Sequence, residues 1–186
     1  PMTVPKQLLV EDGIPLVRRV TAAATTSSAD AVVVITGGPH TERVTLALEG
    51  LDFVELPNPR WIEGAASSIR AGVAWADAQG FDAVTLIESD RNRASSDHLD
   101  ALARLQRRGN PVVATRHADV FGLPAIFGRV TFRDLMALLG DRGACDVVRA
   151  ASSVAVVDWI PEASDQPKRS GIRAAVRTIR SRAGRS

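Results

Sequence analysis

Short apolar runs alternate along the chain with longer segments in which apolar residues recur every three or four positions. The runs are rich in β-branched residues, as in strands buried on both faces. The periodic segments are typical of helices that bury one side. We predict strands at 31–36, 53–56, 83–87, 111–115, 121–127 and 154–157, and helices at 14–25, 41–48, from the turn at 58–59 to about 79, 96–107, 132–139 and around 147. This alternation indicates βαβ units, a mostly parallel sheet and helices on both of its faces.

Polar residues follow several of the predicted strands directly. In an open α/β sheet the ligand site lies beyond the carboxyl ends of the strands. The residues expected there are Thr36-Gly37-Gly38, Asn58, Glu88-Ser89-Asp90, Thr115-Arg116 and Asp158. Asp90 is well placed to hold Mg²⁺ against phosphates, because Mg²⁺ takes few carboxylates together with phosphate oxygens; the alternative is a loop or helix-capping carboxylate. Asp158 could supply a second metal-binding carboxylate, or be a solvated turn residue.

The segment 58–72 runs from a strand through an Asn-Pro turn into a helix. The first turn of a helix has unpaired N–H groups and a partial positive charge, which suit a phosphate. Ser67 and Ser68 add hydroxyl donors. An ordinary capped helix would show the same residues. The segment is therefore a candidate phosphate site with a structural alternative.

Composition narrows the class of protein. The 186 residues, 45% hydrophobic and 24% charged, fit one soluble globular domain. No apolar run is long enough to span a bilayer, and Cys145 is the single cysteine, which excludes an internal disulfide and fits the reducing cytoplasm. No Cys/His cluster has zinc-ligand spacing. The histidines His40, His98 and His117 receive no catalytic role.

Basic residues are concentrated in a tail at 166–186. The chain carries a net charge of +2, but seven basic residues and no acid lie from Lys168 onward, so the rest of the chain carries −5. Ile172, Val176 and Ile179 share one face of a predicted helix beside a stripe of arginines. Such a helix binds an acidic partner, nucleic acid or a membrane surface, or packs its apolar face on the body. Without interleaved aromatic residues, we do not expect a nucleic-acid partner.

Five sequence blocks occur in order between about Pro5 and Asp165. They are Pro5-Lys6-Gln7-Leu8-Leu9 with Gly13-Ile14-Pro15-Leu16, Asn58-Pro59-x-Trp61-x-Glu63-Gly64 with Ser67-Ser68-Ile69-Arg70-Ala71-Gly72, Asp90, Gly122-Leu123-Pro124, and Gly140-Asp141-x-Gly143. In this order and spacing they resemble the MobA-like nucleotidyltransferases, which include the molybdenum cofactor guanylyl- and cytidylyltransferases.

The resemblance implies a Rossmann-like, three-layer nucleotidyltransferase fold over residues 1–165. It implies Mg²⁺-dependent attack of a phosphorylated acceptor, such as molybdopterin, on the α-phosphate of CTP or GTP, with release of pyrophosphate. By matching position, Lys6 would contact phosphates and Asp90 would bind Mg²⁺. Gly37, Ser67, Ser68 and Gly72 would lie near the nucleotide. Such catalysis consists largely of positioning and charge neutralisation.

The chain also departs from the family pattern. Asp90 is followed by Arg91-Asn92 where the family has Gln-Pro, and Leu123 replaces a histidine. Around Asp158 the family has Asp-x-Asp-Thr-Pro, whereas here Trp159-Ile160-Pro161 follows, so the second carboxylate is gone. The family's first strand and its Leu-Ala-Ala-Gly loop have no counterpart in these residues. Two interpretations remain: a working enzyme whose sequence here lacks its start, or an inactive member that binds or regulates.

The missing first strand would normally lie inside the sheet. Because unpaired hydrogen bonds within a sheet are costly, we predict that its neighbours pair directly or accept a strand from a second subunit. The sequence leaves a homo-oligomer open.

Overall fold

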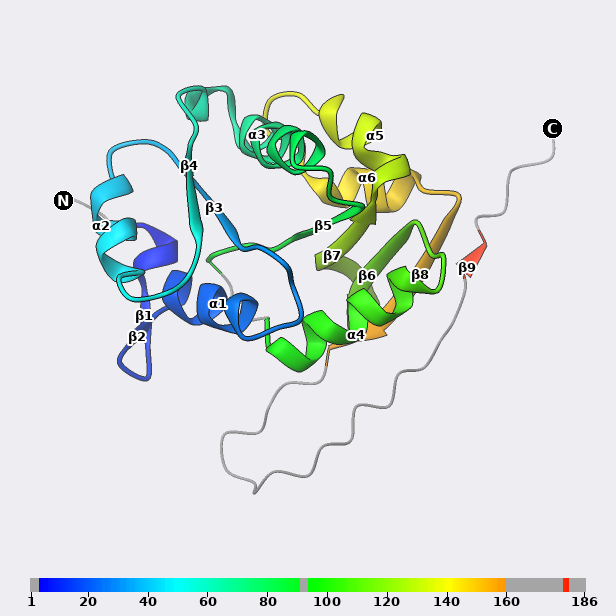
Figure 1. Cartoon of the computed structure of the whole chain (residues 1–186), viewed down its shortest axis with the longest axis horizontal. Helices are drawn as coiled ribbons and strands as arrows, with labels where there is room; N and C mark the ends of the chain where they lie inside the picture. The colour runs from blue at the N-terminus through cyan, green and yellow to red at the C-terminus, as the bar shows by residue number, and fades with distance from the viewer. Residues whose placement is uncertain (1–3, 91–93, 160–178, 181–186) are drawn as a thin grey trace, which may run out of the picture.

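The computed structural model describes residues 4–90, 94–159 and 179–180 of the chain. Strands and helices alternate through most of it, as the hydrophobic pattern predicts (Figure 1). The α-helices are α1 (Leu16–Thr25), α2 (Thr41–Ala47), α3 (Ala65–Ala78), α4 (Ser96–Arg107), α5 (Phe132–Met136) and α6 (Ala144–Ala150). The strands are β1 (Val10–Glu11), β2 (Ile14–Pro15), β3 (Val33–Thr36), β4 (Val54–Pro57), β5 (Ala83–Leu86), β6 (Val112–His117), β7 (Val120–Gly128), β8 (Ser153–Asp158) and β9 (Ile179–Arg180).

The main strands form two sheets in the described part of the chain. β3 and β4 pair in parallel, while a second sheet has the order β5-β7-β6-β8-β9. In that sheet β6 and β8 are parallel, and β7 is antiparallel to both β5 and β6. The predicted mixture of helices and strands is confirmed, but a single, mostly parallel sheet is not what the structure shows.

β7 accounts for part of the difference. The sequence predicts a turn and a short strand at 121–127, whereas β7 extends over nine residues and pairs along both of its edges. It follows β6 through a tight turn in which Ala118 has a positive φ of 52°. A connection this short can join only antiparallel strands.

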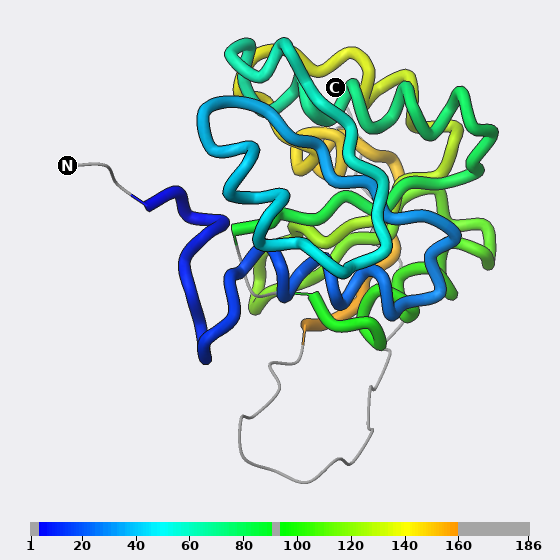
Figure 2. Tube along the Cα trace, turned by 60° about the vertical axis from the view of Figure 1, so that its left-hand side comes forward, coloured from blue at the N-terminus to red at the C-terminus, as the bar shows by residue number. Residues whose placement is uncertain are grey.

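The sequence predicts that the neighbours of the family's first strand pair directly or accept a strand from a second subunit. Direct pairing is wrong for the described residues, and the strand from a second subunit stays a prediction. These neighbours are β3 and β5, and no ladder joins them in the described residues. α3 nevertheless packs against both strands, and Figures 1 and 2 show β3 beside β5. The two sheets therefore share a helical cover without sharing hydrogen bonds.

A hairpin precedes the first helix. Asp12 and Gly13 both have positive φ, 51° and 78°, and connect β1 to β2. A two-residue loop with positive φ at both positions is the turn that matches strand twist, and Asp-Gly favours it. Figure 2 shows this hairpin at the edge of the molecule. The Asp-Gly turn signal in the sequence is confirmed.

Three apolar clusters hold the layers together. The largest packs α3, α5 and α6 on one face of the second sheet, around Val112, Phe127 and Leu135. Another packs α1 and α4 on the opposite face, around Val20, Leu102 and Val113. A third joins Leu8 to α1 and α2. These layers leave the carboxyl ends of β5, β6 and β8 at one edge of the sheet.

The C-terminal tail lies mostly outside the described residues. Ile179 and Arg180, which the sequence places on a basic helix, form β9 and pair antiparallel with Val154 and Ser153 of β8. The helix prediction is wrong for these two residues. For the other tail positions it stays a prediction.

Candidate functional site

The candidate site is the edge of the sheet at which β5, β6 and β8 end. Glu88-Ser89-Asp90 follow β5, Thr115 and Arg116 end β6, and Asp158 ends β8. Gly37 follows β3 and Asn58 follows β4, and these two loops touch each other. The sequence-predicted residues therefore lie in two groups, one per sheet.

Asn58 organises the loop between β4 and α3. Its side chain is buried, and its amide donates to the hydroxyls of Ser67 (2.8 Å) and Ser68 (3.0 Å). Its Oδ1 accepts from the backbone N–H of Arg60 at 3.0 Å. Ser67 in turn donates to the carbonyl of Gly64 at 2.8 Å. The hydroxyl hydrogen of Ser67 is thus used inside the loop, whereas Ser68 only accepts in this network.

The first turn of α3 meets the loop before α6. Gly64 has a φ of 95°, and the backbone N–H of Ala66 donates to the carbonyl of Gly140 at 3.1 Å. A Cβ at Gly64 would lie 2.6 Å from both that carbonyl oxygen and Asp141 Oδ1. One N–H of the helix end is therefore satisfied by protein, beside a carboxylate. The Gly-x-x-Ser-Ser segment therefore has a structural role, because it holds the start of α3 against the loop before α6.

Two further glycines allow close packing. A Cβ at Gly37 would lie 2.7 Å from the Cβ of Trp61, and the Trp61 ring also covers Gly38. A Cβ at Gly72 would lie 3.4 Å from Ile35, where α3 crosses β3. Gly37 and Gly72 thus position the loops and the helix that border the candidate site.

Asp90 and Lys6 come from different elements of the chain. Asp90 is partly exposed beyond β5 and forms no salt bridge with the residues that the structure describes. Lys6 is exposed in a short 3₁₀ turn, Lys6–Leu8, that packs on α1 and α2. No salt bridge joins Lys6 to Asp90 among the described residues.

Asp158 has a cationic partner already. Arg116 donates through Nε (2.5 Å) and Nη2 (2.8 Å) to the two carboxylate oxygens of Asp158. These hydrogen bonds lower the pKa of Asp158 and raise that of Arg116. β5 and β8 lie three strand spacings apart in the sheet, or about 14 Å. No group of three metal-binding side chains forms among the residues described.

A histidine cluster behind this edge was missed by sequence reasoning. His98 is buried, and its Nε2 lies 2.7 Å from the Thr115 hydroxyl. Because that hydroxyl donates to the Pro124 carbonyl, His98 must donate to it, which fixes the Nε2–H tautomer. Burial, and secondarily His117, lowers the pKa of His98 to about 4. A sequence signal for the burial of His98 is its position three residues after Ser95, the residue that caps α4, on the buried face of the helix.

Trp159 completes the cluster. Its ring meets His98 edge-on, with centroids 5.1 Å apart, and tilts against His117 at 6.0 Å. His117 donates from Nε2 to the Leu123 carbonyl at 3.1 Å. Trp159, the residue after Asp158, therefore packs on two histidines at the end of β8.

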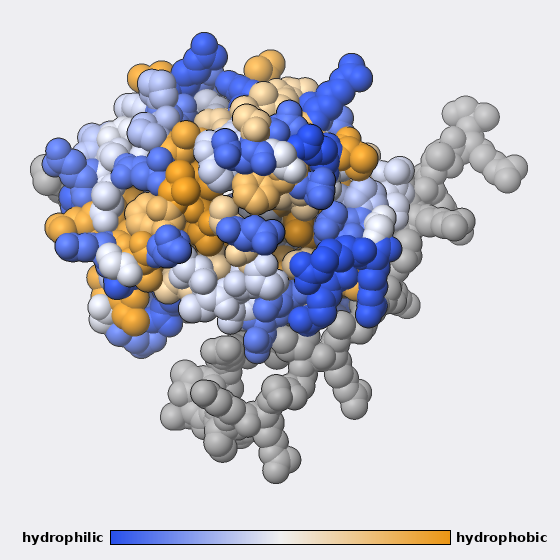
Figure 3. Space-filling view, in the orientation of Figure 1, coloured by the Kyte–Doolittle hydropathy of each residue, from blue (hydrophilic) through white to orange (hydrophobic). Residues whose placement is uncertain are grey.

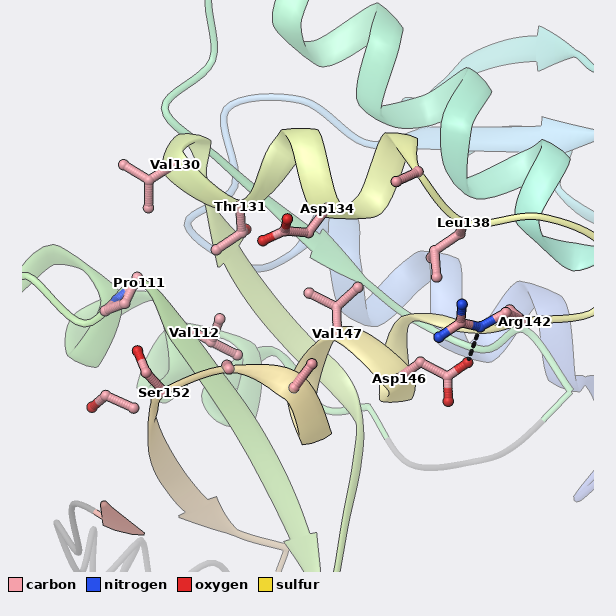
Figure 4. Close-up of a pocket in the computed structure, with 14 residues that line it drawn as sticks. Pro111, Val112, Val130, Thr131, Asp134, Leu138, Arg142, Asp146, Val147 and Ser152 are labelled. Carbon is pink, nitrogen blue, oxygen red and sulfur yellow. Dashed lines mark hydrogen bonds and ion pairs between the residues drawn. The ribbon is translucent and has the colours of Figure 1, made fainter. Parts of the chain in front are cut away.

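A cavity of about 550 Å³ lies at the opposite edge of the sheet (Figure 4). Pro111 and Ser153, at the amino ends of β6 and β8, line it together with α5 and α6. Its carboxylate Asp146 is bound by Arg142 (3.0 Å) and also by Arg149, and hydrogen bonds from these arginines lower its pKa. Because ligands of such sheets bind at the carboxyl ends of strands, we place the candidate site at the Asp90 edge.

Comparison with family models identifies the class of protein. Residues 2–156 match the MobA-like NTP transferase domain. The chain therefore belongs to the MobA-like nucleotidyltransferase family, as the sequence blocks predict. No curated protein sequence matches it significantly.

Solved structures support the same fold. Rv0371c from Mycobacterium tuberculosis H37Rv, in complex with manganese, is 24% identical with a TM-score of 0.67, over 87% of each chain. A nucleotidyl transferase from Methanothermobacter thermautotroptrophicus is 22% identical with a TM-score of 0.69, over 84% of this chain and 75% of the other. Molybdopterin-guanine dinucleotide biosynthesis protein A from Archaeoglobus fulgidus is 13% identical with a TM-score of 0.58, over 82% of this chain and 74% of its own. None of the described helices is long and apolar enough to cross a membrane.

Proposed function

We propose that the protein transfers a nucleotidyl group from CTP or GTP to a phosphorylated acceptor such as molybdopterin, with release of pyrophosphate. Family membership over residues 2–156 supports this proposal. The observation that carries it is the position of Asp90, a partly exposed carboxylate beyond the carboxyl end of β5. Ligands of open α/β sheets bind at that edge.

A divalent metal fits Asp90. Mg²⁺ is bound in proteins by one or two carboxylates together with substrate phosphate oxygens and water, and Asp90 has no salt bridge with a described residue. Bound there, Mg²⁺ would neutralise phosphate charge and orient the triphosphate. Asp158 could join only if Arg116 released it, because the guanidinium holds both carboxylate oxygens.

The remaining predicted residues would act by position and charge. Ser68 keeps a hydroxyl hydrogen for a ligand, whereas Ser67 uses its own on Gly64. We therefore propose Ser68 as the donor of this pair, and Lys6 as an exposed cation that approaches the phosphates. Gly37 and Gly72 would contribute by keeping Trp61 and α3 close to the site.

The alternative function is that of an inactive family member that binds or regulates. The Arg116–Asp158 pair favours it, because it occupies the second metal-binding candidate. The Gly140 carbonyl favours it too, because it takes an N–H group that a phosphate would use at the start of α3.

Isothermal calorimetry separates the two functions. The protein is titrated with CTP, GTP and ATP in the presence of Mg²⁺, and then as Asp90→Ala and as Asp134→Ala, a control carboxylate in the opposite cavity. We expect binding of CTP or GTP that Asp90→Ala weakens by at least about tenfold, or roughly 1.4 kcal/mol, and that Asp134→Ala leaves unchanged. Absence of binding by every nucleotide would contradict the enzyme and favour the alternative.

A further inference from the structure

The cavity at the amino ends of β6 and β8 is large enough for a small molecule. Its volume is about 550 Å³, and ligand pockets usually have volumes of about 300–1,000 Å³. Strand β6, the helices α5 and α6 and the loop between these helices contribute to its walls. The cavity lies at the edge of the sheet opposite Asp90, so the proposed nucleotidyl transfer does not use it.

The walls of the cavity are mostly apolar. Val112 lines it from β6, Val147 from α6 and Leu138 from the loop after α5, and all three are buried. Val130 also lines the cavity and is 79% exposed. Figure 3 shows hydrophobic side chains beside hydrophilic ones around α5. An apolar ligand would remove such surface from water, which stabilises a complex.

Asp134 gives the cavity a carboxylate without a partner. It lines the cavity from α5, and its side chain forms no salt bridge or hydrogen bond with a residue that the structure describes. Figure 4 shows Asp134 on α5 above Val147 of α6. A carboxylate beside apolar walls favours a cationic group of a ligand, such as an ammonium, because charge-assisted hydrogen bonds are strong.

Arg142 gives the cavity the opposite charge. Its Nε donates to Asp146 at 3.0 Å, whereas its two terminal nitrogens have no partner among the described residues. Asp146 is also bound by Arg149, so one carboxylate is shared by two guanidinium groups and this end of the cavity keeps a positive charge. The free nitrogens of Arg142 form a fork that matches the geometry of a carboxylate.

The two charges are separated by apolar side chains. Asp134, Leu138 and Arg142 follow one another at intervals of four residues. Figure 4 shows Leu138 and Val147 between Asp134 and Arg142. The lining therefore presents an anionic group, an apolar stretch and a cationic group in that order. A complementary ligand carries a cation, an apolar chain and an anion.

We propose that this cavity binds a small zwitterion in which an apolar chain of several carbons separates an ammonium group from a carboxylate group. The ammonium would bind Asp134, the chain would lie on Leu138 and Val147, and the carboxylate would bind Arg142. Asp146 would hold the Arg142 guanidinium in place. An α-amino group and its carboxylate do not fit this pattern, because both are attached to the same carbon.

An NMR titration of the 186-residue chain tests the proposal with three probes of equal chain length. The zwitterion is 6-aminohexanoate; hexylamine lacks its carboxylate, and hexanoate lacks its ammonium. We expect 6-aminohexanoate to bind about tenfold or more tightly than either of the other two, because each of them loses one charge-assisted hydrogen bond. The backbone amides of Asp134, Arg142 and Val147 should shift most.

Two substitutions assign the charges. Asp134→Asn should weaken binding of 6-aminohexanoate about tenfold and leave hexanoate binding unchanged, whereas Arg142→Gln should weaken 6-aminohexanoate similarly and leave hexylamine binding unchanged. Arg133→Gln is the matched control, because Arg133 is exposed on α5 and does not line the cavity. Asp134 and Arg142 are also exposed, so equal melting temperatures of the free variants should show that they fold.

Three results would overturn the proposal. The first is the absence of shifts in the cavity amides with 6-aminohexanoate. The second is binding of hexylamine or hexanoate that is as tight as that of the zwitterion. The third is unchanged binding of 6-aminohexanoate by Asp134→Asn or by Arg142→Gln.

Discussion

Protonation of His98 should make the stability of the fold depend on pH. The imidazole is buried between α4 and β6 and is held as the neutral Nε2–H tautomer by Thr115. Its pKa of about 4, against an ordinary value of 6.5, means that the folded protein resists protonation over this interval. Above pH 6.5 the residue is neutral in both states and adds no pH dependence.

Between pH 6.5 and pH 4 only the unfolded chain takes up the proton, so the free energy of unfolding falls as the pH falls. One pKa unit corresponds to 1.36 kcal/mol, so a difference of about 2.5 units destabilises the fold by at most about 3 kcal/mol. That is a large part of the 5–15 kcal/mol that stabilises an ordinary domain. Below about pH 4 both states are protonated and the loss is complete.

The assay is urea denaturation at several pH values from 7.5 to 4, on the parent protein and on His98→Gln. Glutamine keeps an N–H donor for Thr115 but cannot titrate, so the variant should lose less stability between pH 6.5 and 4. His40→Gln is the matched control and should follow the parent. If the parent and His98→Gln lose stability equally over this interval, the buried-histidine reasoning is refuted.

Two further substitutions test the loops around the site. Asn58→Ala removes three hydrogen bonds and should lower the free energy of unfolding, measured by urea denaturation, by about 2–3 kcal/mol. The control Asn110→Ala removes one hydrogen bond and should cost about 1 kcal/mol. Equal losses would contradict the organising role of Asn58. In Gly64→Ala the new Cβ would collide with the backbone of Gly140, and the alanine would have an unfavourable positive φ. The melting temperature of this variant should therefore fall well below that of Gly80→Ala, because position 80 has a similar φ of 82° but no atom within 4 Å of the new Cβ. Equal melting temperatures would show that the contact with Gly140 is relaxed at no cost.

The order of elements could be predicted from the hydrophobic pattern, but their pairing could not. α4 begins and ends at the residues that its apolar spacing predicts. β3 and β5 lie within predicted apolar runs, and β8 extends its predicted run by one residue at each end. Pairing depends on contacts distant in sequence. The antiparallel insertion of β7, and the lack of pairing between β3 and β5, follow from turn geometry and tertiary packing, which the runs themselves do not encode.

The candidate site was predictable as an edge of the sheet, since strand ends can be located in sequence. The sequence did not predict which side chains at this edge remain available to bind a ligand. Asp158 and Ser67 have the right type and position for ligand contacts, yet Arg116 and Asn58 already engage them. The spacing from Ser95 indicates that His98 is buried on α4, but its hydrogen-bond partner could not be predicted, because Thr115 is 17 residues away.

The central claim is that a metal–nucleotide complex binds at the Asp90 edge of the sheet. The most direct measurement is paramagnetic broadening of backbone amide signals by Mn²⁺ with CTP or GTP, since Mn²⁺ substitutes for Mg²⁺ at oxygen ligands. We predict that the signals of Glu88, Ser89 and Asp90 broaden first, and that Asp90→Ala abolishes the effect. Broadening centred on Asp134 and Asp146, in the cavity at the opposite edge, would contradict the account.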